Sequence, residues 1–376
     1  MGGSAPGQVR ASDPPQLRLS IRVAFMACHS FVAGNVSLAA DFGRPLPQNE
    51  AMSTAATPRR GLALGGGGVL GGTWAVGALT SLEQDLGIAM DSFEIIVGTS
   101  AGSVLGALLT SGVSLSELRD HYNDQAVITG PLTGFEFDPD EATGGHRPGL
   151  PKFNGPGSPA LILETLRHLG KVPPTAALSA FLPVGGRNLD RIAQLITHAH
   201  PSDDWPVKPE LWVIAMDYQD AHRVVFGRTG APVVSLDQAV VASCAIPGWF
   251  APVSIHGRSY VDGGALSATS VDVLEHMGLD EVFVVAPMVS FDMDAPDHLS
   301  AKLERRWRAE VTKACCAEAA KVAATGTRVH VVGPGPEYLV AIGANLMDAS
   351  RRSFVLHTAL HTSPKAWEHA LEREAC

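Results

Sequence analysis

After residue 60, continuous apolar runs typical of buried strands are followed by apolar residues at helical spacing. A short apolar run, Gly61–Leu64, ends in glycines, and small and apolar residues then recur at helical spacing as far as Leu86. A second apolar run begins at Phe93, and a helix rich in small residues extends to Leu109. Strand, helix, strand and helix in this order predict parallel strands covered by helices on both faces.

The pattern loosens between Thr110 and Pro209. Helical fragments at Leu115–His121, Ala160–Leu169 and Leu189–His198 are separated by loops rich in glycine and proline. We expect a helical cap over about residues 113–209 that covers the site and shapes a pocket. A plain helical insertion without contact to a substrate is the alternative, which the sequence leaves open.

The sheet resumes after this region. Apolar runs predict further strands, and a long helix from about Pro296 to Ala324 lies between the last two. Four basic residues of this helix, at 302, 305, 306 and 308, have acidic neighbours at 304 and 310, so we expect its solvated face here rather than contact with anionic lipid. The predicted strands are 211–216, 223–226, 258–262, 281–286 and 328–332.

Residues 1–57 differ from the rest of the chain. They contain several prolines and one weak apolar patch, and no periodic pattern that could pack into a core. We interpret them as a disordered extension or as sequence upstream of a true start at Met52. A signal peptide that ends near Leu38-Ala39-Ala40 is the alternative. Residues 58–376 then form one α/β domain, and no run reaches the 18 or so apolar residues of a membrane-spanning helix.

Charge and cysteine content limit the partners and the compartment. A net charge of -10 offers no basic face for a phosphate backbone, so nucleic acid is not expected as a partner. The five cysteines form no C-x-x-C pair, which favours a reducing compartment. We therefore expect a cytoplasmic protein, and leave membrane association, secretion and oligomeric state open.

The most informative stretch is Phe93–Leu109, where a β-branched run stops at Gly98-Thr99-Ser100-Ala101-Gly102 and a helix begins at once. This order is typical of a nucleophile elbow, in which the serine has a strained backbone and glycines avoid collisions with the adjoining strand and helix. Ser100 would then lie at a helix N-terminus, which favours developing negative charge. An ordinary strand-to-helix turn is the alternative.

A glycine loop follows the first strand and contains Gly66-x-Gly68-x-x-Gly71. A dinucleotide-binding loop would also need an acidic residue at the end of the second strand, where this chain has Gly98-Thr99-Ser100. We interpret the loop as an oxyanion hole in which the amides of Gly66, Gly67 and Gly68 face a substrate carbonyl.

A carboxylate before two glycines, Asp262-Gly263-Gly264, follows the short strand at 258–262. This pattern suggests an acid at a strand end that no neighbouring side chain blocks. A D-G turn that joins two strands is the alternative. The pair His198-x-His200 does not share a helical face and lacks a third ligand, so we expect no metal site.

The three motifs, in this order and context, resemble the patatin-like phospholipase family. Further similarity runs through 242–252, and the resemblance extends over about Arg60 to Leu360. It implies a three-layer α/β fold with a mostly parallel central sheet, a dyad of Ser100 as nucleophile and Asp262 as base, and no cofactor. The chain departs from many members of the family at Val69-Leu70, where they carry a basic residue.

These observations predict a lipid acyl hydrolase of phospholipase A or lysophospholipase type, acting through an acyl-enzyme on a lipid ester. One alternative is a Ser-His-Asp esterase or acyltransferase, for which His330 and His357 are available. Another is a non-catalytic lipid- or nucleotide-binding protein, in which Ser100 would be dispensable. Contact with a membrane surface, the head group and the acyl-chain preference cannot be read from the sequence.

Overall fold

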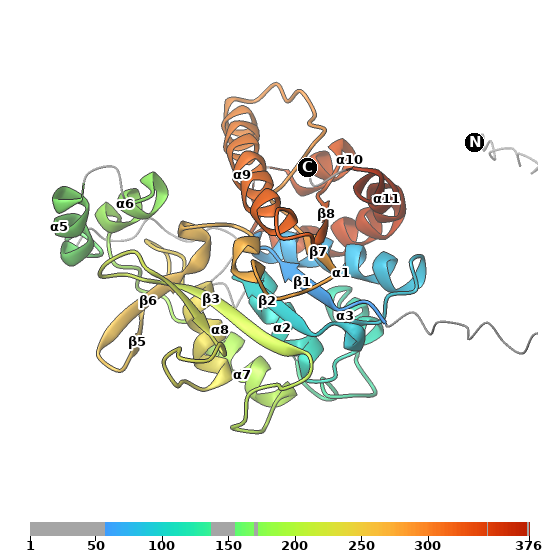
Figure 1. Cartoon of the computed structure of the whole chain (residues 1–376), viewed down its shortest axis with the longest axis horizontal. Helices are drawn as coiled ribbons and strands as arrows, with labels where there is room; N and C mark the ends of the chain where they lie inside the picture. Colours follow the sequence, from blue (N-terminus) through green and yellow to red (C-terminus); the bar gives the residue numbers. More distant parts are fainter. Residues whose placement is uncertain (1–56, 137–154, 169–171, 344, 374–375) are drawn as a thin grey trace, which may run out of the picture. The chain divides into compact units, whose positions relative to one another are not determined.

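A computed structural model of the chain describes residues 57–136, 155–168, 172–343, 345–373 and 376. The proposed extension, the start at Met52 and the signal-peptide alternative lie outside the described residues, as does part of the expected cap. Figure 1 shows the arrangement of the elements.

Eight strands form one sheet in the order β5-β6-β3-β2-β1-β7-β8, and β4 pairs with β3. The pairs among β3, β2, β1, β7 and β8 are parallel, whereas β4 and the β5–β6 hairpin are antiparallel. The sheet is therefore mostly parallel, as the sequence predicts. The strands are β1 (Arg60–Leu64), β2 (Ile95–Thr99), β3 (Glu210–Asp217), β4 (Arg223–Phe226), β5 (Val253–Ile255), β6 (Arg258–Asp262), β7 (Glu281–Val285) and β8 (Arg328–Val332).

Helices cover both faces of this sheet, which gives three layers and confirms the predicted α/β class. The α-helices are α1 (Gly68–Gln84), α2 (Ala101–Thr110), α3 (Leu115–Tyr122), α5 (Pro159–Arg167), α6 (Pro174–Phe181), α7 (Asp190–Ala199), α8 (Leu236–Cys244), α9 (Leu299–Ala323), α10 (Pro336–Ile342) and α11 (Arg352–Glu372). Short 3-10 turns are η1 (Met90–Ser92), η2 (Gly263–Ala265), η3 (Val271–Leu274) and η4 (Ala349–Arg351).

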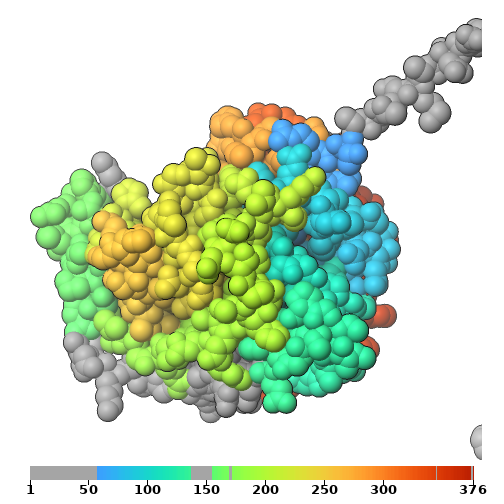
Figure 2. Space-filling model, turned by 90° about the horizontal axis from the view of Figure 1, so that it is seen from below, coloured from blue at the N-terminus to red at the C-terminus, as the bar shows by residue number. Residues whose placement is uncertain are grey.

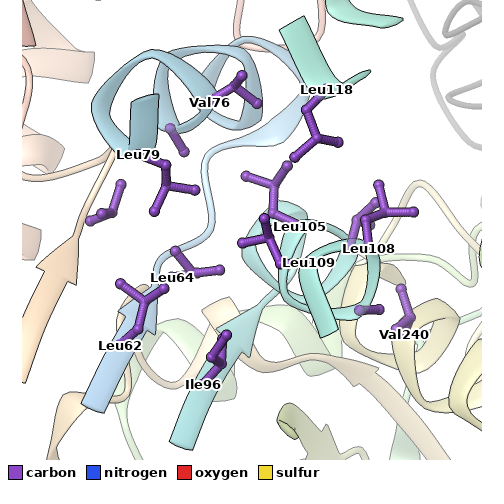
Figure 3. Close-up of a cluster of buried hydrophobic side chains, with 14 of the residues drawn as sticks. Leu62, Leu64, Val76, Leu79, Ile96, Leu105, Leu108, Leu109, Leu118 and Val240 are labelled. Carbon is purple, nitrogen blue, oxygen red and sulfur yellow. The ribbon is translucent and has the colours of Figure 1, made fainter. Parts of the chain in front are cut away.

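Alternate strand residues feed two separate cores. Leu62 and Leu64 of β1 pack with α1, α2 and α11, whereas Ala63 faces α9 and η3. Figure 3 shows leucines of α2 between Leu64, Leu118 of α3 and Val240 of α8. Every residue of β2 is buried, as expected for a parallel strand that is covered on both faces.

The register of β3 brings distant parts of the chain together. Ile214 pairs with Thr99 of β2, and the next residue, Ala215, pairs with Asp262 of β6. On the opposite edge of β3, both residues pair with β4. Strands β2 and β6 therefore lie along the same edge of β3 and meet end to end. The end of β2, which leads into Ser100, therefore adjoins the end of β6.

The region that the sequence predicts as a cap divides into two parts. Helices α3 and α7 pack into the main core. Helices α5 and α6 instead join a small cluster with Met216, Tyr218 and Val261 on β3 and β6. Figures 1 and 2 show α5 and α6 beside the β5–β6 hairpin, and Thr175 Oγ1 donates a hydrogen bond to the Ala265 carbonyl at 2.6 Å.

The expected solvated face of α9 is partly wrong. Lys302 and Arg306 are exposed, but Arg305 and Arg308 are buried. Arg308 pairs with Glu304 at 2.8 Å and donates to the Pro287 carbonyl at 2.5 Å. Buried guanidinium groups are tolerated here because carboxylates and carbonyls satisfy their donors. Acidic residues near basic ones in this helix therefore belong both to a buried ion pair, Arg308–Glu304, and to a solvated surface.

Candidate active site

Ser100 lies on the turn between β2 and α2 and has φ 54° and ψ −123°. A positive φ is rare for a residue with a side chain, and the strain must be held by the surrounding contacts. The Ser100 amide donates to Ser243 Oγ at 2.9 Å, and Ser243 Oγ donates to the Ile214 carbonyl at 2.6 Å. The Ser100 carbonyl accepts from Ser103 Oγ at 2.7 Å. These bonds hold the strained turn against β3.

Two glycines are required by the close approach of backbone on either side of Ser100. A Cβ on Gly98 would lie 2.5 Å from Ser103 Cα, and one on Gly102 would lie 2.0 Å from the Leu64 carbonyl oxygen. Real side chains do not approach backbone this closely. The elbow interpretation of the sequence expected these collisions with the strand and the helix.

Asp262 ends β6 and is 5% exposed, while Ser100 is 8% exposed. The Gly264 amide donates to Asp262 Oδ1 at 2.7 Å, and the Asp262 amide donates to the Ala245 carbonyl at 3.0 Å. The Ser100 hydroxyl lies close enough to the Asp262 carboxyl group to act on its pKa as a donor. A Cβ on Gly263 would lie 2.7 Å from the Ile214 carbonyl oxygen, so the D-G-G turn packs tightly on β3.

Burial raises the pKa of Asp262 to about 6, although the hydrogen bonds from Ser100 and Gly264 act in the opposite direction. A carboxylate with such a pKa is a stronger base than a solvated aspartate, yet it is still mostly ionised at neutral pH. The side chain could therefore accept a proton from the Ser100 hydroxyl.

The glycine loop differs from the prediction in one donor. The Gly66 amide already donates to the Ala268 carbonyl at 2.8 Å, so it is not free to bind an oxyanion. Among the described residues, the amides of Gly67 and Gly68 have no hydrogen-bond acceptor. They lie where α1 begins, at the positive end of its dipole. Gly71 does not face the site as a donor, because its amide bonds the Gly67 carbonyl at 3.0 Å.

An open cavity lies in front of Ser100. Its walls are mostly apolar, which suits an acyl chain. Helix α2 and the glycine loop form one side, α7 and the end of α8 another, and α3 and α11 supply the few polar side chains. The lining residues are Gly68, Val69, Ser100, Ala101, Val104, Leu108, His121, Tyr122, Leu189, Ile192, Leu195, Cys244, Ile246, Phe250, Met347 and Arg352. No residue of α5 or α6 is among them.

Sequence reasoning missed several polar residues in and around the cavity. Ser243 supports the elbow, and its only local signal is its place in the similar stretch before Asp262. Cys244 lies beside Ser100 and Asp262, and burial raises the pKa of its thiol, which stays protonated. Burial likewise raises the pKa of Tyr122 to about 12. Nothing in the local pattern assigned Tyr122 or Arg352 to a cavity.

The histidines proposed for alternative chemistry lie elsewhere. His330 on β8 stacks at 5.2 Å from the Phe283 ring, and His357 is exposed on α11. His198 and His200 contact the Thr133 and Asp204 carbonyls, respectively. Within the described residues, no group of three histidine, cysteine or acidic side chains could hold a metal ion. The structure also brings no histidine other than His121 to the cavity wall, as far as the described residues go.

A strained serine turn, a buried carboxylate beside it and an apolar cavity in front are the features of serine esterases. A comparison with protein families gives the particular class. The model of the family "Patatin-like phospholipase" matches residues 62–274, more than half of the chain. The chain belongs to the patatin-like phospholipase family, a class of lipid ester hydrolases.

Solved structures with a similar fold include VipD from Legionella pneumophila, at 14% identity and a TM-score of 0.39, with 84% of this chain and 67% of that chain covered. The type III effector ExoU matches at 15% identity and a TM-score of 0.31, and the match covers 84% of this chain and 53% of ExoU. In a heterodimeric complex, ExoU from Pseudomonas aeruginosa is bound to SpcU. Human group IVD cytosolic phospholipase A2, solved with a fluorophosphonate, matches at 13% identity and a TM-score of 0.33. The match covers 84% of this chain and 60% of that chain. The chain therefore spans about half to two thirds of these relatives.

In the described part of the chain, no helix combines the length and the apolar character needed to cross a membrane.

Proposed function

We propose that the protein hydrolyses carboxylic esters of phospholipids or lysophospholipids with Ser100 as nucleophile and Asp262 as base. The main support is the register of β3, which brings the end of β2 next to the end of β6, so that the Ser100 hydroxyl and the Asp262 carboxyl group lie within reach of each other. The raised pKa of Asp262 and the strained φ of Ser100 agree with an activated nucleophile.

In this mechanism, Asp262 accepts the proton of the Ser100 hydroxyl while Oγ bonds to the ester carbonyl carbon. The carbonyl π electrons move to oxygen and form a tetrahedral oxyanion. When the oxyanion collapses, the ester C–O bond breaks, and the leaving alcohol or lysolipid takes the proton from Asp262. Water then attacks the acyl-enzyme, Asp262 accepts its proton, and Ser100 regains a proton as the fatty acid leaves.

The oxyanion requires donors that are fixed before the reaction begins. We propose the amides of Gly67 and Gly68 for this role, without Gly66, whose amide is already bonded. A Cβ on Gly67 would lie 2.8 Å from Pro287 Cβ, and Arg308 holds the Pro287 carbonyl from behind. This support fixes the loop, so that little reorganisation is needed in the transition state.

A fluorophosphonate that labels activated serines tests the assignment directly. We expect mass spectrometry to find the label on Ser100, and Ser100→Ala to lose both the label and ester turnover by at least about 10⁴-fold. Ser111→Ala is the matched control, because Ser111 follows the end of α2 and its hydroxyl bonds the Ala107 carbonyl, away from the turn. A label on another serine would contradict the proposal.

His121 is the residue with which a Ser-His-Asp alternative can be tested, because it is the histidine at the cavity wall. Burial, together with the charge of Arg352, lowers the pKa of His121 to about 4. Such a histidine is neutral at pH 7 and a weak base. We expect His121→Gln to keep the rate of labelling at Ser100 within about tenfold, and a loss as large as that of Asp262→Asn would favour the triad.

The same residues could pass the acyl group to an alcohol rather than to water. Supplying a lysolipid or glycerol as an acceptor during turnover distinguishes the two outcomes. We propose hydrolysis, and expect free fatty acid to remain the main product when the acceptor is present. Acylated acceptor as the main product would make the protein an acyltransferase.

A further inference from the structure

The cavity in front of Ser100 contains one permanent positive charge, which the proposed dyad does not use. Among the described residues that line it, Arg352 and His121 are the basic ones, and the depressed pKa of His121 leaves it neutral. The field of the Arg352 guanidinium acts to lower the pKa of both His121 and Tyr122. Arg352 therefore places a positive charge at the wall of an otherwise apolar cavity.

The hydrogen bonding of Arg352 is incomplete. Its side chain is 3% exposed, and Nη2 donates to a carboxylate oxygen of Asp124. Nε is buried and has no hydrogen-bond partner among the described residues. The Asp124 side chain is 65% exposed, so it compensates the buried charge from the solvent side only. A buried guanidinium with an unused donor is costly, and an anionic ligand in the cavity would compensate its charge.

The segment that carries Arg352 lies against the glycine loop. The Leu70 amide donates to the Leu346 carbonyl at 2.9 Å, and a Cβ on Gly68 would lie 2.8 Å from Met347 Sδ. The loop itself presents Val69 to the cavity, and this side chain carries no charge. The start of α11 thus brings a cation to the same cavity as Ser100 and the free amides of the loop.

The rest of the cavity indicates which part of a substrate this cation would meet. Leu108 of α2 and Leu189, Ile192 and Leu195 of α7 form an apolar wall suited to an acyl chain. A guanidinium adds nothing to the binding of such a chain, but it matches the paired oxygens of a phosphate. The phosphate of a phospholipid lies a few bonds from its ester groups, within reach of one cavity.

We propose that Arg352 binds the phosphate group of the lipid ester and makes the enzyme selective for phosphate-bearing substrates over neutral glycerides. The proposal rests on the esterase activity proposed above. It also assigns a role to a residue that lies outside the matched region 62–274. Arg352 is thus a specificity-determining residue rather than a part of the dyad.

The test compares kcat/KM for lysophosphatidylcholine and for 1-monoacylglycerol of the same acyl chain. We expect Arg352→Gln to lower the value for the phosphate-bearing ester by about 10- to 100-fold, as is typical of losing a charge-assisted hydrogen bond, and to change the glyceride value less than about threefold. Arg352→Lys should keep part of the selectivity. Arg351→Gln, which alters the neighbouring arginine outside the cavity lining, is the matched control.

Asp124→Asn separates phosphate binding from a structural ion pair. Removing the carboxylate frees the guanidinium, so phosphate binding predicts an unchanged or higher kcat/KM for the lysophospholipid. If the ion pair is purely structural, Asp124→Asn and Arg352→Gln should each lower kcat/KM for both substrates alike, and each should lower the melting temperature. Inorganic phosphate should inhibit wild type weakly and competitively and should inhibit Arg352→Gln less. Equal inhibition of the two proteins would argue against Arg352 as the phosphate site.

Binding keeps this inference distinct from the proposed activity. An ether-linked lysophosphatidylcholine cannot be hydrolysed, and calorimetry measures its Kd for wild type and Arg352→Gln. A wild type that hydrolyses neither ester would overturn the proposed function, while tighter binding of the ether lipid to wild type than to Arg352→Gln would still support the phosphate site. Equal Kd values, or an unchanged substrate ratio in Arg352→Gln, would overturn the phosphate site alone.

Discussion

The turn around Ser100 and the helix pair α5–α6 represent opposite ways of building on the same sheet. At the turn, backbone meets backbone so closely that glycines are required, and the side chains are buried. On α5–α6 and the residues that follow, large apolar side chains are exposed, and only a small cluster holds them to β3 and β6. These exposed residues, which we name the apolar patch, are Leu163, Leu166, Leu178, Phe181, Leu182 and Val184. The proposed chemistry is thus held on a rigid framework, whereas the apolar patch leaves large side chains exposed.

Turnover should separate the two regions most strongly. Asp262→Asn removes the proposed base while keeping its size, and we expect kcat/KM on a short, dispersed ester to fall about 10²- to 10⁴-fold. Leu178→Asn makes the matching change in the apolar patch and should leave this value within about twofold. Comparable losses in both variants would show that the two regions are not independent.

Stability should separate them next. An alanine at Gly102 places a Cβ against the Leu64 carbonyl, and we expect it to lower the free energy of unfolding by about 3 kcal/mol or more. A Cβ at Gly186, in the loop after α6, meets nothing within 4 Å, so Gly186→Ala should change stability by less than about 0.5 kcal/mol. Urea unfolding of both variants measures this difference. A stable Gly102→Ala would contradict the close approach of α2 to the end of β1.

The raised pKa of Asp262 predicts that this side chain lowers the free energy of unfolding at neutral and higher pH. Because the folded state binds this proton more tightly than the unfolded chain, the stability that the group contributes is lost as pH rises from about 4 through about 6. Asp262→Asn never ionises, so at pH 8 it should be more stable than wild type by on the order of 1 to 3 kcal/mol, with no gain near pH 4. Unfolding at several pH values measures the difference. A constant difference across this range would argue against the raised pKa.

The smallest effect on folding is expected in the apolar patch. Leu178→Asn with Phe181→Asn should change the free energy of unfolding by less than about 1 kcal/mol, because both side chains are already exposed. Urea unfolding of the double variant and of wild type measures this change. A loss well above about 1 kcal/mol would contradict the exposure of the two side chains.

The sequence predicted the parallel framework because each strand and helix there has a clear local period. Gly98, Ser100 and Gly102 define their own turn by local sterics, so the motif carries its geometry with it. Helices α6, α10 and α11 were not singled out, since short or proline-containing segments give a weak periodic signal. Helix α11 is fixed instead by tertiary packing: a Cβ on Gly77 of α1 would lie 2.5 Å from Ala359 Cβ.

Contacts between distant segments could not be predicted in the same way. The meeting of Ser100 and Asp262 was expected from a resemblance, but its physical cause is the shared edge of β3, which only the register of the sheet reveals. The bonded amide of Gly66 depends on Ala268, and the burial of Arg308 depends on Pro287. Arg352 reaches the cavity only because the segment before α11 packs on the glycine loop.

The central claim is that Asp262 activates Ser100, and the rate of fluorophosphonate labelling as a function of pH tests it most directly. The account predicts that the label on wild-type Ser100 appears faster as pH rises through about 6, where Asp262 ionises, and that Asp262→Asn reacts slowly at every pH without this inflection. Equal rates for the two proteins, or an inflection that persists in Asp262→Asn, would contradict the account.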